Sequence, residues 1–72
     1  MPEKLPVVSG KETIKILVKL GFEVRMGKGD HIVVKKDHLV FSVPLHNTLK
    51  KGTLRKILKQ IGISVEKFNS ML

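Results

Sequence analysis

Cysteine is absent from this sequence, acidic residues are few, and no apolar run is long enough to cross a bilayer. Without cysteine the chain has no disulfide, no cysteine nucleophile and no thiolate metal site. A membrane-spanning helix needs about 20 predominantly apolar residues, and the N-terminus lacks the pattern of a secretory signal peptide. We therefore expect a soluble, cytoplasmic protein without a membrane partner.

The shortage of acidic residues leaves a strongly basic chain. Fourteen Lys and Arg against six Asp and Glu give a net charge of +8 and a pI near 10.1. This balance is typical of proteins that bind nucleic acid or another acidic partner. Because 72 residues form one small domain, spanning 1–72, a deep enclosed pocket is not expected. A surface site that acts on a large charged polymer suits this size better.

The first helix has clear boundary signals. Ser9 and Glu12 are spaced as a capping box, so we expect a helix that begins at Gly10, runs to about Leu20 and stops at Gly21. Lysines recur every four residues along it, beside its apolar stripe. Alternation and turn residues then predict three strands, at 22–26, 31–35 and 38–43. A loop is expected at 45–51, then an amphipathic helix that Gly62 ends, followed by a short helical turn capped by Ser64.

The order of these elements predicts an α+β fold, α-β-β-β-α, in which two helices pack on one face of a three-stranded antiparallel sheet. Side chains alternate between the two faces of a strand. We therefore expect the core face to receive Phe22, Val24, Met26, Ile32, Val34, Leu39, Phe41 and Val43. The open face is expected to carry His31, Val33, Lys35, His38, Val40 and Ser42.

His31 is the residue that the sequence singles out. It follows the turn of Gly29 and Asp30 at the start of an expected strand. Imidazole exchanges protons near neutral pH, and a glycine turn lets the backbone approach a phosphate. His31 is thus a candidate general acid or base, although a solvated histidine is the commoner occupant of such a position. We interpret His38 and His46 as structural or incidental.

Other sites have little support in the sequence. The histidines lack the HxH or HxxxH spacing of a metal site, and no Ser-His-Asp arrangement, phosphate-binding P-loop or dinucleotide fingerprint is visible. We expect neither a metal nor a cofactor.

The second expected helix carries a basic row. Residues 47–60 hold five basic side chains and no acid. Lys50 and Lys51 stand at the helix N-terminus, where the backbone amides and the helix dipole also favour anions. Arg55 and Lys59 continue the row. Such a surface can hold an RNA backbone without reading its sequence, but a solvated helix face has the same composition.

Several motifs between Pro6 and Phe68 occur together: Ser9-Gly10-Lys11-Glu12, Leu20-Gly21-Phe22-Glu23, Gly29-Asp30-His31, Val43-Pro44-Leu45-His46 and the run Lys51 to Ile63. In this combination the chain resembles the HicA-type (YcfA-like) toxins, the small ribonucleases of toxin–antitoxin pairs. The resemblance implies a fold like that of double-stranded-RNA-binding domains and metal-independent cleavage of mRNA. It also implies a catalytic histidine at His31 and a HicB-type antitoxin as the protein partner.

We accordingly predict an endoribonuclease in which His31 transfers a proton, while Lys28 and the amides near Gly29 stabilise the charged phosphorane. An acidic antitoxin is expected to cover His31 and to contact Val33 and Val40. Two alternatives stay open. One is a non-catalytic RNA-binding module. The other is an inactive toxin that still binds its antitoxin, because Asp30 stands where many family members carry serine.

Overall fold

The computed structural model describes residues 5–72 of the chain. These residues contain three helices and three strands. In chain order they are α1 (Gly10–Lys19), β1 (Glu23–Met26), β2 (His31–Lys36), β3 (Leu39–Pro44), α2 (Lys51–Ile61) and α3 (Val65–Ser70). The predicted α-β-β-β-α order is confirmed, and α3 is the short helix predicted after Ser64.

The helix ends follow the local chemistry of the sequence. The Glu12 amide donates to Ser9 Oγ at 3.1 Å, and the Ser9 amide donates to the Glu12 carboxylate at 3.0 Å. This capping box starts α1 as predicted. Gly21 (φ +96°) and Gly62 (φ +73°) take the left-handed backbone conformation that stops α1 and α2. The Ser64 hydroxyl accepts from the Lys67 amide and caps α3.

The three strands form an antiparallel meander in the order β1-β2-β3. In the middle of the sheet, Val34 of β2 pairs with Val24 of β1 on one side and with Phe41 of β3 on the other. Ile32, Val34 and Val43 are buried against the helices. The predicted alternation is therefore confirmed on the central strand, and it leaves His31, Val33 and Lys35 on the other face.

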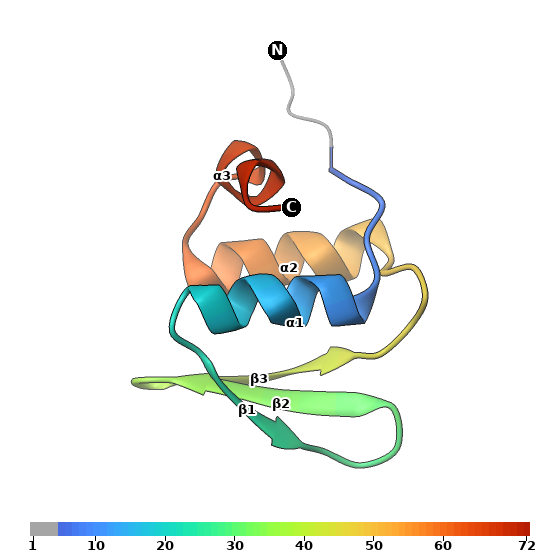
Figure 1. Cartoon of the computed structure of the whole chain (residues 1–72), viewed down its shortest axis with the longest axis vertical. Helices are drawn as coiled ribbons and strands as arrows, with labels where there is room; N and C mark the ends of the chain where they lie inside the picture. Colours follow the sequence, from blue (N-terminus) through green and yellow to red (C-terminus); the bar gives the residue numbers. More distant parts are fainter. Residues whose placement is uncertain (1–4) are drawn as a thin grey trace.

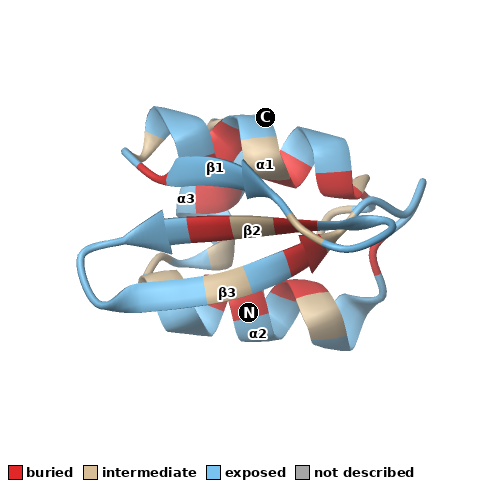
Figure 2. Ribbon diagram, turned by 90° about the horizontal axis from the view of Figure 1, so that it is seen from below, coloured by how far each residue is buried: buried red, intermediate tan, exposed pale blue. Residues whose placement is uncertain are grey.

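The molecule has three layers (Figure 1). Helices α1 and α2 lie side by side on one face of the sheet, and α3 lies on the far side of these helices. Phe68 of α3 is completely buried, so α3 closes the core opposite the sheet. The second face of the sheet is uncovered by any helix of residues 5–72, as the view onto it shows (Figure 2). We call it the open face.

Three residues lie in positions that strand alternation does not predict. Met26 was expected in the core, yet 84% of its surface is exposed, and Val24 is 39% exposed. Both belong to the core side by register, but β1 is an edge strand and its outer side is not covered, so all four of its residues are exposed. His38 lies in the turn before β3 rather than on the open face. Asp37 in that turn has a φ of +53°.

Candidate functional site

The turn between β1 and β2 fixes the backbone of His31. The Gly27 amide donates to the His31 carbonyl at 3.0 Å, and the His31 amide donates to the Lys28 carbonyl at 3.1 Å. A Cβ atom on Gly27 would lie 2.6 Å from the His31 oxygen, so this close approach requires glycine. Gly29 has a φ of +60°, and a Cβ there would meet nothing within 4 Å. The backbone at Gly29 is therefore open to a large ligand.

His31 begins β2 and pairs with Pro44 across the sheet. Its register places it on the open face, at the end of the molecule where β3 finishes. Its side chain is exposed, and within residues 5–72 no hydrogen bond or ion pair holds the imidazole. The neighbouring Asp30 carboxylate forms no ion pair with it. The imidazole is thus accessible to a polymer. Pairing within the sheet fixes the backbone of His31 but not its side chain.

The segment after β3 joins this turn to the start of α1. The Leu45 amide donates to the Asp30 carbonyl at 2.6 Å, and the Gly10 amide donates to the His46 carbonyl at 3.0 Å. A Cβ atom on Gly10 would overlap the Pro44 carbonyl oxygen, so α1 can meet β3 here only through glycine. No pattern in the sequence predicts this junction, although Gly10 and Pro44 each lie in one of the short motifs described above.

The basic row lies on α2, in the helix layer rather than on the open face. Lys50 occupies the N-cap position without a side-chain capping bond, and the first turn of α2 contains no acid. Lys51, Arg55 and Lys59 follow at intervals of four residues, and all are exposed. The row is therefore a continuous stripe of positive charge along the helix.

The fold places only some of the residues predicted to bind RNA phosphate at the same end of the molecule as His31. The start of α2, the start of α1 and the turn before His31 lie at the same end of the molecule (Figure 1). Lys28, Gly29, Lys50 and Lys51 are therefore at this end together with His31. Lys59 lies in the last turn of α2, at the opposite end. A single phosphate cannot touch both the whole row and His31.

The two valines predicted to contact an antitoxin do lie on the open face. Val33 is half-buried and pairs with Arg25 and Ser42, while Val40 is 59% exposed and pairs with Lys35. This register makes the valines diagonal neighbours on adjacent strands. Charged side chains surround them, including an exposed ion pair of 3.8 Å between Arg25 and Glu23. The open face is thus mixed rather than apolar.

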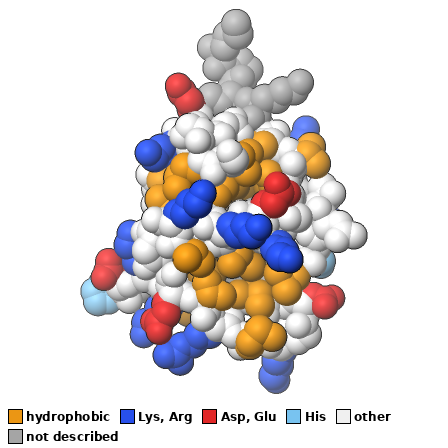
Figure 3. Space-filling model, viewed as in Figure 1, with side chains coloured by type: hydrophobic (Ala, Val, Ile, Leu, Met, Phe, Trp, Pro, Cys, Tyr) orange, Lys and Arg blue, Asp and Glu red, His pale blue; other side chains and the backbone are white. Residues whose placement is uncertain are grey.

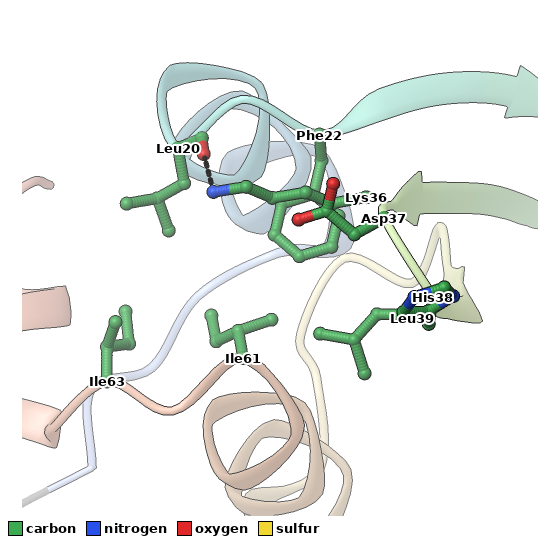
Figure 4. Close-up of a pocket in the computed structure, with 8 residues that line it drawn as sticks. All are labelled: Leu20, Phe22, Lys36, Asp37, His38, Leu39, Ile61 and Ile63. Atoms are coloured by element: carbon green, nitrogen blue, oxygen red, sulfur yellow. Dashed lines mark hydrogen bonds between the residues drawn. The ribbon is translucent and has the colours of Figure 1, made fainter.

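A pocket of about 380 Å³ lies at the other end of the sheet (Figure 4). It is lined by Leu20, Phe22, Lys36, Asp37, His38, Leu39, Ile61 and Ile63. Lys36 Nζ donates to the Leu20 carbonyl at 2.7 Å and lies 5.8 Å above the Phe22 ring. The lysine therefore ties β2 to the end of α1. This pocket is at the end of β2 opposite His31 and does not contribute to the site around it.

Within residues 5–72, no group of three or more His, Asp or Glu side chains is arranged to hold a metal ion. No helix of this part of the chain is long and apolar enough to cross a membrane.

Comparison with known families identifies the chain. Residues 10–63 match the family described as HicA toxin of bacterial toxin-antitoxin. The chain belongs to the HicA toxin family. The matched region runs from the start of α1 through the sheet and past the end of α2, so it contains the turn, His31 and the basic row. No curated protein and no solved structure gives a significant match. As a HicA toxin, the protein acts in a toxin–antitoxin pair and has an antitoxin as its partner.

Proposed function

We propose that this toxin is a metal-independent endoribonuclease that cleaves mRNA in the cytoplasm, with His31 as its proton-transfer group. The observation that carries the proposal is the position of His31 in a HicA toxin: an exposed imidazole on the open face, beside a turn whose backbone a polymer can reach. The α-β-β-β-α order, as in double-stranded-RNA-binding domains, and the basic α2 favour RNA as the polymer.

The proposed chemistry needs no water and no metal. His31 takes the proton of a ribose 2′-hydroxyl, and the resulting oxygen attacks the adjacent phosphorus. The bond from phosphorus to the 5′ oxygen breaks, and the leaving oxygen takes up the proton that His31 holds. The products are a 2′,3′-cyclic phosphate and a 5′-hydroxyl end. Lys28 and the amides near Gly29 stabilise the extra negative charge of the phosphorane. Proton transfer of this kind supplies about 10² to 10⁴-fold in rate.

The remainder of the surface binds the substrate and the inhibitor. Lys50, Lys51, Arg55 and Lys59 hold successive phosphates of the RNA backbone. A HicB-type, acidic antitoxin covers His31 and contacts Val33 and Val40 on the open face. Complementary charge speeds the association of such a pair, while buried apolar contacts slow its release.

The test compares the wild-type protein with His31→Ala and His31→Gln on labelled RNA in EDTA. Fragments that end in a 2′,3′-cyclic phosphate are expected from the wild type, and at least 100-fold fewer from either variant. Inducible expression of the same proteins should show loss of toxicity in parallel. If both variants cleave as fast as the wild type, His31 is not part of the mechanism.

A non-catalytic RNA-binding role is the second candidate. The observation that favours it is the imidazole of His31, which no side chain within residues 5–72 orients. Catalytic bases are usually held by a further group. Tight RNA binding without cleavage by the wild-type protein would support this role. An Asp30→Ser variant that gains cleavage would instead identify an inactive toxin that has kept its antitoxin.

A further inference from the structure

The sheet has two edge strands, β1 and β3, and within residues 5–72 the outer side of each lacks a strand partner. Within residues 5–72, β1 pairs with β2 alone. The hydrogen bond from the Gly27 amide to the His31 carbonyl sets the alternation of the antiparallel ladder. By that alternation, Arg25 and Glu23 turn their amides and carbonyls toward β2, while Val24 and Met26 turn theirs outward. The outer side of β1 therefore offers hydrogen-bond donors and acceptors from two residues.

An exposed apolar patch accompanies this edge. Val18 of α1 is 52% exposed, and Val24 and Met26 of β1 are 39% and 84% exposed. Figure 3 shows hydrophobic side chains gathered on the face of the molecule where α1 and β1 lie. Val24 and Met26 are on the core side of the sheet by register, since they pair with Val34 and Ile32. We refer to Val18, Val24 and Met26 as the β1 edge patch.

Positive charge borders the patch. Lys11, Lys15 and Lys19 repeat every four residues and form a row along the exposed side of α1. Figure 3 shows Lys and Arg side chains in a line over α1, above the lower hydrophobic area. The acid of α1, Glu12, is engaged by the amide and hydroxyl of Ser9. A partner seated on the β1 edge patch thus meets lysines on the side toward α1.

We propose that the free edge of β1 is a strand-addition site for the antitoxin. An extended segment of that protein pairs with the outward backbone groups of Val24 and Met26. Its apolar side chains cover the β1 edge patch, and its carboxylates face Lys11, Lys15 and Lys19. Strand addition of this kind takes affinity from main-chain hydrogen bonds and specificity from side-chain contacts. The proposal rests on the antitoxin partner that the HicA family implies, and not on RNA cleavage by His31.

The charge distribution selects this partner over a second copy of the chain. Two copies joined through β1 would form one continuous sheet with both α1 helices on the same side. Their lysine rows would then approach each other, in addition to the repulsion between two chains of net charge +8. A four-residue strand is a short contact by itself. It adjoins the open face through Arg25 and Glu23, so an antitoxin on the edge can continue across the sheet toward Val33.

Amide hydrogen exchange of the ¹⁵N-labelled toxin, alone and saturated with the antitoxin encoded beside its gene, tests the backbone pairing. The inward amides of Arg25 and Glu23 should exchange slowly in both samples. The outward amides of Val24 and Met26 should exchange rapidly in the free toxin and at least tenfold more slowly in the complex. If these two amides exchange equally fast in both samples, the antitoxin does not pair with β1 and the proposal is wrong.

Val24→Pro tests the same contact by affinity. It removes one outward amide and leaves the ladder to β2 intact, which an edge strand tolerates. The variant should bind the antitoxin at least tenfold more weakly while it keeps the RNA cleavage of the free wild type. Met26→Ser keeps the backbone amide and gives a second readout if Val24→Pro fails to fold. Unchanged antitoxin affinity in a folded Val24→Pro variant would overturn the proposal.

Two further results separate this site from other possibilities. His31→Ala should bind the antitoxin through β1 with the same protection of Val24 and Met26, so the proposal stands even where His31 proves not to be catalytic. A dimer of the toxin alone that Val24→Pro abolishes, seen by sedimentation, would assign the edge to a second copy and overturn the proposal.

Discussion

Gly10, the first residue of α1, lies against Pro44, the last residue of β3, so closely that a Cβ atom on Gly10 would overlap the Pro44 carbonyl oxygen. The contact brings the start of the first helix to the end of the sheet where His31 lies. The Gly10 amide also donates to the His46 carbonyl in the segment that follows. The position of His31 relative to the helix layer therefore depends on a residue without a side chain.

Gly10→Ala should destabilise the protein by about 1–3 kcal/mol, because the added methyl group forces α1 away from β3. Gly52→Ala is the matched control, since a Cβ atom there meets nothing within 4 Å. That change should raise stability by about 0.5–1 kcal/mol through helix propensity. Urea unfolding followed by circular dichroism measures both. Equal stability of Gly10→Ala and the wild type would show that α1 and β3 can move apart to fit the methyl group without loss of stability.

Lys36→Ala should lower the free energy of unfolding by about 1 kcal/mol, because it removes the hydrogen bond to the Leu20 carbonyl and the cation above the Phe22 ring. Lys35→Ala removes the same charge from the exposed open face and should change stability by less than about 0.5 kcal/mol. Thermal and urea unfolding of the two variants provide the comparison. A smaller effect for Lys36 than for Lys35 would contradict the assignment of Lys36 as the tie between β2 and α1.

Lys51→Ala combined with Arg55→Ala should reduce the salt slope of RNA affinity by about two units, since each phosphate contact contributes about one. Binding to unrelated RNA sequences should weaken about equally. Lys56→Ala combined with Lys67→Ala removes the same charge from outside the row and should change the slope less. Titrations at several salt concentrations measure these slopes. An unchanged slope in the first variant would mean that the row on α2 is only a solvated face.

Val33→Asp combined with Val40→Asp should weaken antitoxin binding at least tenfold, because two carboxylates would be buried against an acidic protein. Circular dichroism must show that the variant folds. Ser42→Asp places a single carboxylate on the same face and should have a smaller effect. Calorimetric titration with the antitoxin gives the affinities. Wild-type affinity of the folded double variant would remove the two valines from the interface.

The helix boundaries could be predicted because they depend on neighbours in the sequence. The Ser9 capping box needs only Glu12 three residues on, and Gly21 and Gly62 need only their own freedom at positive φ. The open-face position of His31 could be predicted for a similar reason. Alternation along β2 depends on a period of two, and that central strand pairs with a neighbouring strand on each side.

The features that could not be predicted from the sequence depend on contacts between distant parts of the chain. Alternation gives the side of the sheet on which Met26 lies, but burial requires a helix above that side, and β1 is an edge strand. The junction between Gly10 and Pro44 and the hydrogen bond between Leu45 and Asp30 join segments that no local pattern relates. The separation of Lys59 from His31 likewise follows from the direction of α2 in the fold.

Helices α1 and α2 run in the same direction, and both begin at the end of the molecule that carries the turn before His31 (Figure 1). Each helix dipole places about half a positive charge at its amino end. The two helix dipoles therefore add to a protein whose net charge is +8. The net charge attracts a polyanion from a distance, whereas the aligned amino ends act only over the first turn of each helix. The His31 end thus favours the negative charge of a bound polyanion more than the opposite end does.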